Sequence, residues 1–408
     1  MLKNYPLSIK LLVGFALVML IAEFHRIGDF NIFLLASKSM AEGHNMYVMY
    51  FVHGYKYFYS PLFAILIYPL TLIPLELAGF IWNLLSFVML GRLFWVIQKL
   101  YFNHIKFPQN KIFILAFLAL IYPLYLNFHQ TQMSVFVLFS IFECLYRIQN
   151  KQFLLAAFWL AIAINIKIMP LVFIPYLIYR REYKVVLYVI LFSVLFLVIP
   201  MLSVGYSNNI VLHREWFKLL NPLKPKNVID LHERQLHGLT SLIASLFTDV
   251  INISEKPIRR HIVLLEHQTV SYIINTVRGF LVLFTFYFLR TKPFVIKRNK
   301  LSCFWEISYI TLLIPLIFPH QQSYAFVLML PSVIYLVYFF NNGGLKAVKP
   351  KWHKVMLRCF IVAAIIVNLT LLLGEFRELY WHFKTMTYGA LIILVLLALC
   401  QPKYIKEN

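Results

Sequence analysis

Repeated long apolar runs, separated by short polar segments, constrain this chain more than any other feature of its sequence. A helix needs about 20 apolar residues to cross the hydrocarbon core of a bilayer. With 61% hydrophobic and 13% charged residues, the composition is that of a membrane protein and not of a soluble globule. We therefore predict an all-α polytopic membrane protein of about 12 transmembrane helices, with residues 1–408 forming one integral membrane domain. The expected spans are residues 9–22, 77–98, 111–128, 132–147, 152–167, 169–180, 185–203, 270–290, 302–318, 323–340, 355–373 and 384–400.

A further apolar run, residues 61–74, is short and is interrupted by Pro61, Pro69 and Pro74. Proline removes a backbone donor and breaks a helix, so we interpret this run as a re-entrant or juxtamembrane segment. The interpretation also sets the orientation, because one more span would move every later loop to the other side. Basic residues then gather on the side of both termini, and the positive-inside rule makes that side cytoplasmic.

The formal net charge of +22 would suggest nucleic-acid binding in a soluble protein. Here the basic residues lie in short loops, so we expect contacts to anionic membrane lipid and no nucleic acid. The outer side has two long loops, residues 23–76 and 204–269, and the second is expected to contain a juxtamembrane helix near residues 238–247. We therefore expect the chemistry on the outer face of a plasma or inner membrane.

Metal and disulfide chemistry is not expected. The four cysteines show no CxxC pattern and no Cys/His spacing for a metal. Glu23 and Glu42 are weaker candidates near Asp29, and no DxD motif or paired acid stands beside Asp29 to hold a divalent cation. Lys3 and Lys10 precede the first apolar run without a cleavage pattern after it, which indicates a retained helix. We predict a reaction that needs neither metal nor cofactor.

Asp29 follows the first apolar run by a few residues and faces the first outer loop. A carboxylate near hydrocarbon is costly, so it is a functional candidate by default, here as a general base. The alternative is a helix-capping or interfacial carboxylate, since Asp at a helix end often only satisfies backbone amides.

Lys167 and His320 fall at outer helix ends in this topology, and Gln132 lies at another outer turn. Lysine there opposes the positive-inside bias, so we interpret Lys167 as a phosphate contact. His320 suits donation to a phosphate or a sugar hydroxyl, or alternatively a hydrogen bond to the backbone of its turn. Gln132 suits substrate binding, or alternatively a capping or interhelical hydrogen bond.

The long outer loops supply further candidates for substrate binding. Arg214, Arg234 and Gln235 can bind phosphate or a sugar, although charged loop residues commonly form only a solvated face. Tyr59, with Tyr47, Tyr55 and Tyr57, can bind a sugar or belong to an aromatic belt at the membrane interface.

Outside the cytoplasm there are no nucleotide sugars, so a transferase there must use a donor carried by a lipid. Such an enzyme needs a carboxylate base, cations for the leaving phosphate and an apolar groove. The rival hypothesis is a transporter or flippase of a lipid-linked glycan. Transporters carry intramembrane charges near mid-span, whereas the candidate residues here gather at one face.

The order of several short motifs resembles glycosyltransferase family 87, mannosyltransferase-like membrane enzymes of the GT-C superfamily. Asp29 is followed by motifs at 41–47, 57–63, 131–132, 167–170, 235–238 and 320–331. The chain departs from the family pattern at Thr131, where glycine is usual, at His237, where a small residue is usual, and at Ser60, where a second proline is common.

This resemblance, over residues 20–335, implies a GT-C-like bundle and a polyprenyl-phosphate sugar donor, commonly of mannose. It also implies a lipid-linked or cell-envelope glycan or glycolipid acceptor and inversion at the anomeric carbon. Carried over by residue, Asp29 would be the base, while Lys167 and His320 would bind the donor phosphate.

Overall fold

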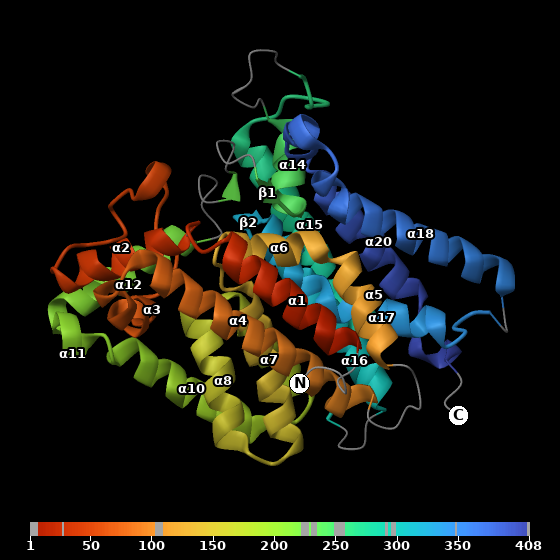
Figure 1. The fold of residues 1–408 in the computed structure, drawn as a ribbon, viewed down its shortest axis with the longest axis horizontal. Helices are drawn as coiled ribbons and strands as arrows, with labels where there is room; N and C mark the ends of the chain where they lie inside the picture. Colours follow the sequence, from red (N-terminus) through yellow and green to blue (C-terminus); the bar gives the residue numbers. More distant parts are fainter. Residues whose placement is uncertain are drawn as a thin grey trace. The chain divides into compact units, whose positions relative to one another are not determined.

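The computed structural model describes residues 7–26, 28–102, 109–221, 228–229, 235–248, 258–289, 293–294, 299–346 and 349–405. It is 78% helical, and its sheet is a two-stranded ladder, so the predicted all-α class is confirmed (Figure 1). The chain divides into two compact units. The first unit comprises residues 1–106, 125–221 and 293–296, and the second comprises residues 107–124, 222–292 and 297–408.

The first unit is a group of antiparallel helices. Its elements are α1 (Leu7–Ala22), α2 (Phe30–Ala41), η2 (Val52–Gly54), α3 (Pro61–Ile67), η3 (Tyr68–Leu72), α4 (Leu75–Ile97), the π-helical turn η4 (Gln98–Phe102), the C-terminal half of α6 (Ile121–His129), α7 (Ser134–Gln149), α8 (Phe153–Ile166), η5 (Met169–Val172), α9 (Phe173–Tyr179), α10 (Tyr183–Val198), α11 (Met201–Val204) and α12 (Tyr206–Leu220). Helices α4, α7, α8 and α10 pack one against the next in this order (Figure 1).

Two of the helix connections in this unit are tight for the same reason. Lys151 and Arg181 have positive φ angles, 59° and 63°, just after α7 and α9. In each case the next N–H turns back to a carbonyl of the last helical turn, as in Gln152 N–H to Arg147 O at 2.9 Å. This C-terminal motif satisfies carbonyls that a helix end leaves unpaired and sends the chain straight into an antiparallel neighbour.

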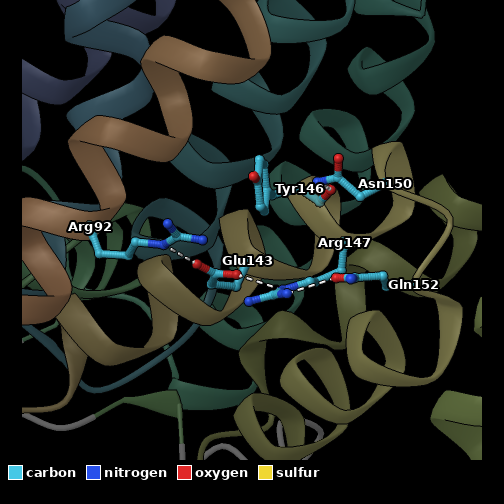
Figure 2. A network of polar contacts seen from close by, with 6 residues as sticks. All are labelled: Arg92, Glu143, Tyr146, Arg147, Asn150 and Gln152. Carbon is cyan, nitrogen blue, oxygen red and sulfur yellow. Dashed lines mark hydrogen bonds and ion pairs between the residues drawn. The ribbon is translucent and has the colours of Figure 1, made fainter.

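A buried ion-pair network links α4 to α7 (Figure 2). Glu143 of α7 is 2% exposed, and its two carboxylate oxygens contact Arg92 Nε at 2.6 Å and Arg147 Nε at 3.1 Å. The Arg92 guanidinium also lies 4.2 Å from the ring centroid of Trp95. A carboxylate this buried needs a partner, and Arg92 supplies one across the contact between the two helices.

The second unit contains helices and the two short strands. Its elements are α5 (Gln109–Ala119), the N-terminal half of α6, β1 (Leu236–His237), α14 (Leu239–Phe247), α15 (His267–Phe288), α16 (Lys300–Ile317), β2 (Gln321–Gln322), η6 (Ser323–Met329), α17 (Leu330–Asn341), α18 (Pro350–Asn368), η7 (Leu369–Leu371), η8 (Gly374–Phe376), α19 (Arg377–His382), α20 (Thr385–Leu399) and η9 (Pro402–Tyr404). Helix α14 lies where the sequence predicts a helix in the second outer loop.

Helix α17 is the centre of this unit, because all of its residues from Leu330 to Phe340 are buried. It packs against α5, α16, α18 and α20. Since its own side chains are buried on every side, α17 forms a core helix within the second unit.

All twelve predicted apolar runs contain helix, but six helices in the described part of the chain are long and apolar enough to span a membrane. The number is up to eight if each of two bent pairs forms one span. Helix α8, with 14 residues, is about 21 Å long and shorter than the hydrocarbon core of about 30 Å. The chain is thus a membrane protein, and the predicted count of about 12 spans is not confirmed.

One bent pair is held together by a side chain. Helices α5 and α6 meet at an angle of 68°, and Asn368 of α18 lies at the break. Its Nδ2 donates to Ala119 O at 2.9 Å and its Oδ1 accepts from Tyr122 N–H at 2.9 Å. The amide therefore replaces backbone hydrogen bonds that the bend removes, as a broken helix within a membrane requires.

Candidate active site

The predicted base, Asp29, is partly exposed and stands at the N-terminal boundary of α2. Its side chain makes no capping hydrogen bond to that helix, so the alternative interpretation as a helix cap is wrong. One carboxylate oxygen instead accepts a 2.5 Å hydrogen bond from Nε2 of Gln132. Gln132 lies in the turn between α6 and α7 and is 1% exposed. Two candidates that are far apart in sequence are thus direct partners.

Tyr59 sets the direction of this hydrogen bond. Its hydroxyl donates to Oε1 of Gln132 at 3.0 Å, and the Met133 N–H also points to Oε1 at 3.4 Å. Burial and the nearby charge of Asp29 raise the pKa of Tyr59, so the hydroxyl keeps its proton. Because Oε1 accepts twice, the amide nitrogen of Gln132 must face Asp29.

Lys167 completes the group at the end of α8. Its Nζ lies 5.7 Å from the ring centroid of Tyr59, within the range of a cation–π contact. Burial lowers the pKa of the Lys167 ammonium to about 8, and the opposite charge of Asp29 raises it. The ammonium form of Lys167 thus predominates at pH 7. We call Asp29, Gln132, Tyr59 and Lys167 the acid–amide cluster, and all four belong to the first unit.

The turn that carries Gln132 is rigid. Gln132 N–H donates to Asn127 O at 2.7 Å, and Trp82 Nε1 donates to Gln132 O at 3.4 Å. The side chain of Asn127 accepts from the N–H groups of Ser134 and Val135, at 3.2 and 3.4 Å. The bonds to Asn127 pair N–H groups at the start of α7 that have no acceptor within the helix, and together these bonds hold the turn in place.

Glycine allows the Asp29 turn to reach this turn. Gly28 has φ of +47°, and a Cβ atom there would lie 2.6 Å from Gln130 Cα. That distance is too short for any other residue, and the conformation itself favours glycine. The backbone before Asp29 therefore rests directly on the backbone before Gln132.

The segment that carries Tyr59 is held from several sides. Tyr47 donates its hydroxyl to Tyr59 O at 2.7 Å, and Trp216 of α12 donates to Phe58 O at 3.1 Å. Tyr47, Tyr57 and Tyr59 are all buried, whereas Tyr55 is 41% exposed. Three of the four tyrosines therefore pack inside the unit and do not form an interfacial belt.

Gln235 and His320 belong to the second unit, where a short ladder brings their segments together. Strand β1 pairs antiparallel with β2, with His237 opposite Gln321. His320 precedes β2 in a turn with φ of 54°, and Gln235 precedes β1. Gly238 follows β1 with φ of +96°. Glycine is needed there because a Cβ atom would lie 2.6 Å from Pro315 O. This pairing was not predicted from the sequence.

Two predicted residues, Arg214 and Arg234, remain. Arg214 is exposed on α12, whose buried face carries His213 and Trp216. Arg234 lies outside the described residues. Within the described ranges, no group of three or more His, Cys, Asp or Glu side chains is arranged to hold a metal ion.

Sequence reasoning missed one pair beside the cluster. Glu23, which lies just past α1, contacts His129 Nδ1 at 2.8 Å. The acid and the histidine are 106 residues apart, and no local pattern links them. The glycine directly before Asp29 was the available signal that this turn packs closely against other backbone.

The acid–amide cluster combines a fixed, partly exposed carboxylate with a cation. Such a pair can accept a proton from an attacking hydroxyl and stabilise a departing anion. Comparison with known proteins agrees with this chemistry, because the profile of glycosyltransferase family 87 matches residues 57–291, more than half of the chain. No match is found among curated proteins.

Proposed function

The chain belongs to glycosyltransferase family 87, and from this membership we propose that it transfers a hexose, mannose, from a polyprenyl-phosphate donor to a glycan hydroxyl. The acceptor is a lipid-linked or cell-envelope glycan. The transfer takes place on the outer face of a plasma or inner membrane, with both termini in the cytoplasm. The family membership favours an enzyme over the flippase hypothesis.

The observation that carries this proposal is the hydrogen bond from Gln132 to Asp29 in the acid–amide cluster. A carboxylate that accepts an N–H keeps a fixed orientation. In the proposed reaction Asp29 takes the proton of the acceptor hydroxyl, and that oxygen forms a bond to the anomeric carbon. The bond from this carbon to the phosphate oxygen breaks, and polyprenyl phosphate leaves with the electron pair. A single displacement of this kind inverts the anomeric configuration.

Lys167 is proposed to bind the phosphate of the donor. Its ammonium lies beside Tyr59 and experiences the charge of Asp29. Negative charge grows on the phosphate oxygen as the glycosidic bond breaks, so a fixed cation stabilises the transition state more than the bound donor. His320, Gln235, Arg214 and Arg234 keep their predicted roles as ligands of phosphate or sugar.

The test uses the full chain, purified in detergent, with a panel of polyprenyl-phosphate hexoses and a mixed glycolipid acceptor, and detects products by mass. We expect a new glycosidic product from the mannose donor. Asp29→Asn should lower the transfer rate by a factor of roughly 10² to 10⁴. The variant should still elute as a folded protein in size-exclusion chromatography. Glu42→Gln removes an exposed acid at the other end of α2 and should retain the rate. Full turnover by Asp29→Asn would exclude Asp29 as the base.

A further inference from the structure

A contact between an acid and a histidine lies next to the acid–amide cluster. Glu23 is 6% exposed and lies in the turn that joins α1 to Asp29. Its Oε2 is 2.8 Å from Nδ1 of His129, the last residue of α6. The backbone N–H of Arg26 donates to Glu23 O at 3.0 Å, so the acid is part of an ordered turn. A nearly buried carboxylate at this position requires a partner.

His129 is itself oriented by its neighbour on α6. Its ring stacks on Tyr125, with centroids 5.3 Å apart and planes inclined by 18°. The Tyr125 hydroxyl lies 3.5 Å from the same Nδ1. A neutral imidazole with its proton on Nδ1 still donates to Glu23, so the contact does not need a charged histidine.

The Glu23 contact is one of three between the same two turns. Glu23 meets His129, Gly28 rests on Gln130, and Asp29 accepts from Gln132. The first turn carries the proposed base, and the second carries its hydrogen-bond donor. Contacts at both ends and in the middle restrict the first turn to one position on the second.

We propose that Glu23 and His129 are positioning residues that hold Asp29 at its reactive position. This inference rests on the proposed role of Asp29 as the base. Neither residue touches the substrate; they act by fixing the turn that carries Asp29. Loss of the pair removes one of these three contacts, so the turn shifts on its neighbour and the carboxylate meets the acceptor hydroxyl less often.

The experiment compares Glu23→Ala, Glu23→Gln and Glu23→Asp by kcat, KM for the donor and thermal stability. We expect Glu23→Ala to lower kcat by about tenfold to 10²-fold, as small misplacements do, with the donor KM nearly unchanged. Glu23→Gln should restore most of kcat, because an amide oxygen still accepts from His129 Nδ1. Glu23→Asp keeps the charge but is one methylene shorter, so it should remain folded and lose kcat.

Arg92→Ala is the matched control. It removes another interhelical contact to a buried acid in the same unit and leaves Glu143 paired with Arg147. It should lower thermal stability without changing kcat. The inference is overturned if Glu23→Ala keeps the wild-type kcat, if Glu23→Gln does not recover it, or if Arg92→Ala loses as much. Active Asp29→Asn would instead refute the proposed function, and the two failures are therefore distinguishable.

Discussion

The side-chain amide of Gln132 donates a 2.5 Å hydrogen bond to the carboxylate of Asp29, although 103 residues separate them in sequence. Tyr59 fixes the other end of the amide. The three side chains form a chain of donors that runs from a neutral phenol to a carboxylate. Each member is therefore oriented by the previous one.

Replacement of Gln132 by glutamate should change the pH dependence of transfer. The new carboxylate would face Asp29 at hydrogen-bond distance, and two like charges cannot both remain ionised there. The pair would then hold one proton to a higher pH. We expect the acidic limb of the profile of kcat/KM against pH to shift to higher pH, so that transfer is slower at neutral pH. An acidic limb identical to that of the wild type would show that Gln132 does not contact Asp29 during catalysis.

Lys167 should give the profile its alkaline limb. Its pKa is lowered to about 8, so the ammonium is present below that pH and is lost as the pH rises through it. We expect donor binding to weaken above about pH 8. Lys167→Arg should move this limb to a higher pH, because arginine stays protonated, whereas Lys167→Met should weaken donor binding at every pH. The measurement is the donor KM from pH 6 to 10.

Gly28→Ala should reduce both stability and transfer. The added methyl group would lie 2.6 Å from Gln130 Cα, which forces the Asp29 turn away from the Gln132 turn. Gly43→Ala is the control, because Gly43 also has a positive φ, +85°, but has open space around it. Both variants share the strain of alanine at positive φ, about 1 to 2 kcal/mol. The difference in kcat between them isolates the close approach at Gly28, and equal rates would argue against its importance.

Asn368→Ala should destabilise the second unit. It leaves the Tyr122 N–H and the Ala119 carbonyl without their partner at the α5–α6 break. A buried polar group left unpaired costs about 1 to 3 kcal/mol, so the melting temperature in detergent should fall by several degrees. Asn341→Ala removes an amide that bonds within its own helix, to Val337 O at 2.7 Å, and should have a smaller effect. Equal melting temperatures would show that the break needs no side-chain partner.

Local sequence was informative about which segments become helical. Each predicted apolar run contains helix. The proline-containing run at residues 61–74 forms two short helical pieces, α3 and η3, and no long helix. Composition could not predict helix lengths, because an apolar run such as residues 111–128 can bend within itself. The break at Leu120 is bridged by hydrogen bonds to Asn368, which lies more than two hundred residues away.

The sequence by itself determined the helical class, the membrane setting and the choice of Asp29, Gln132, Tyr59 and Lys167 as separate candidates, because hydropathy and residue chemistry are local properties. Only the tertiary structure decided that these four are neighbours and that Asp29 bonds to Gln132 and not to its own helix. It alone also disclosed the Glu23–His129 pair and the ladder between the Gln235 and His320 segments. Contacts of this kind depend on how turns pack in space, and no periodicity in the chain encodes the distance between two turns.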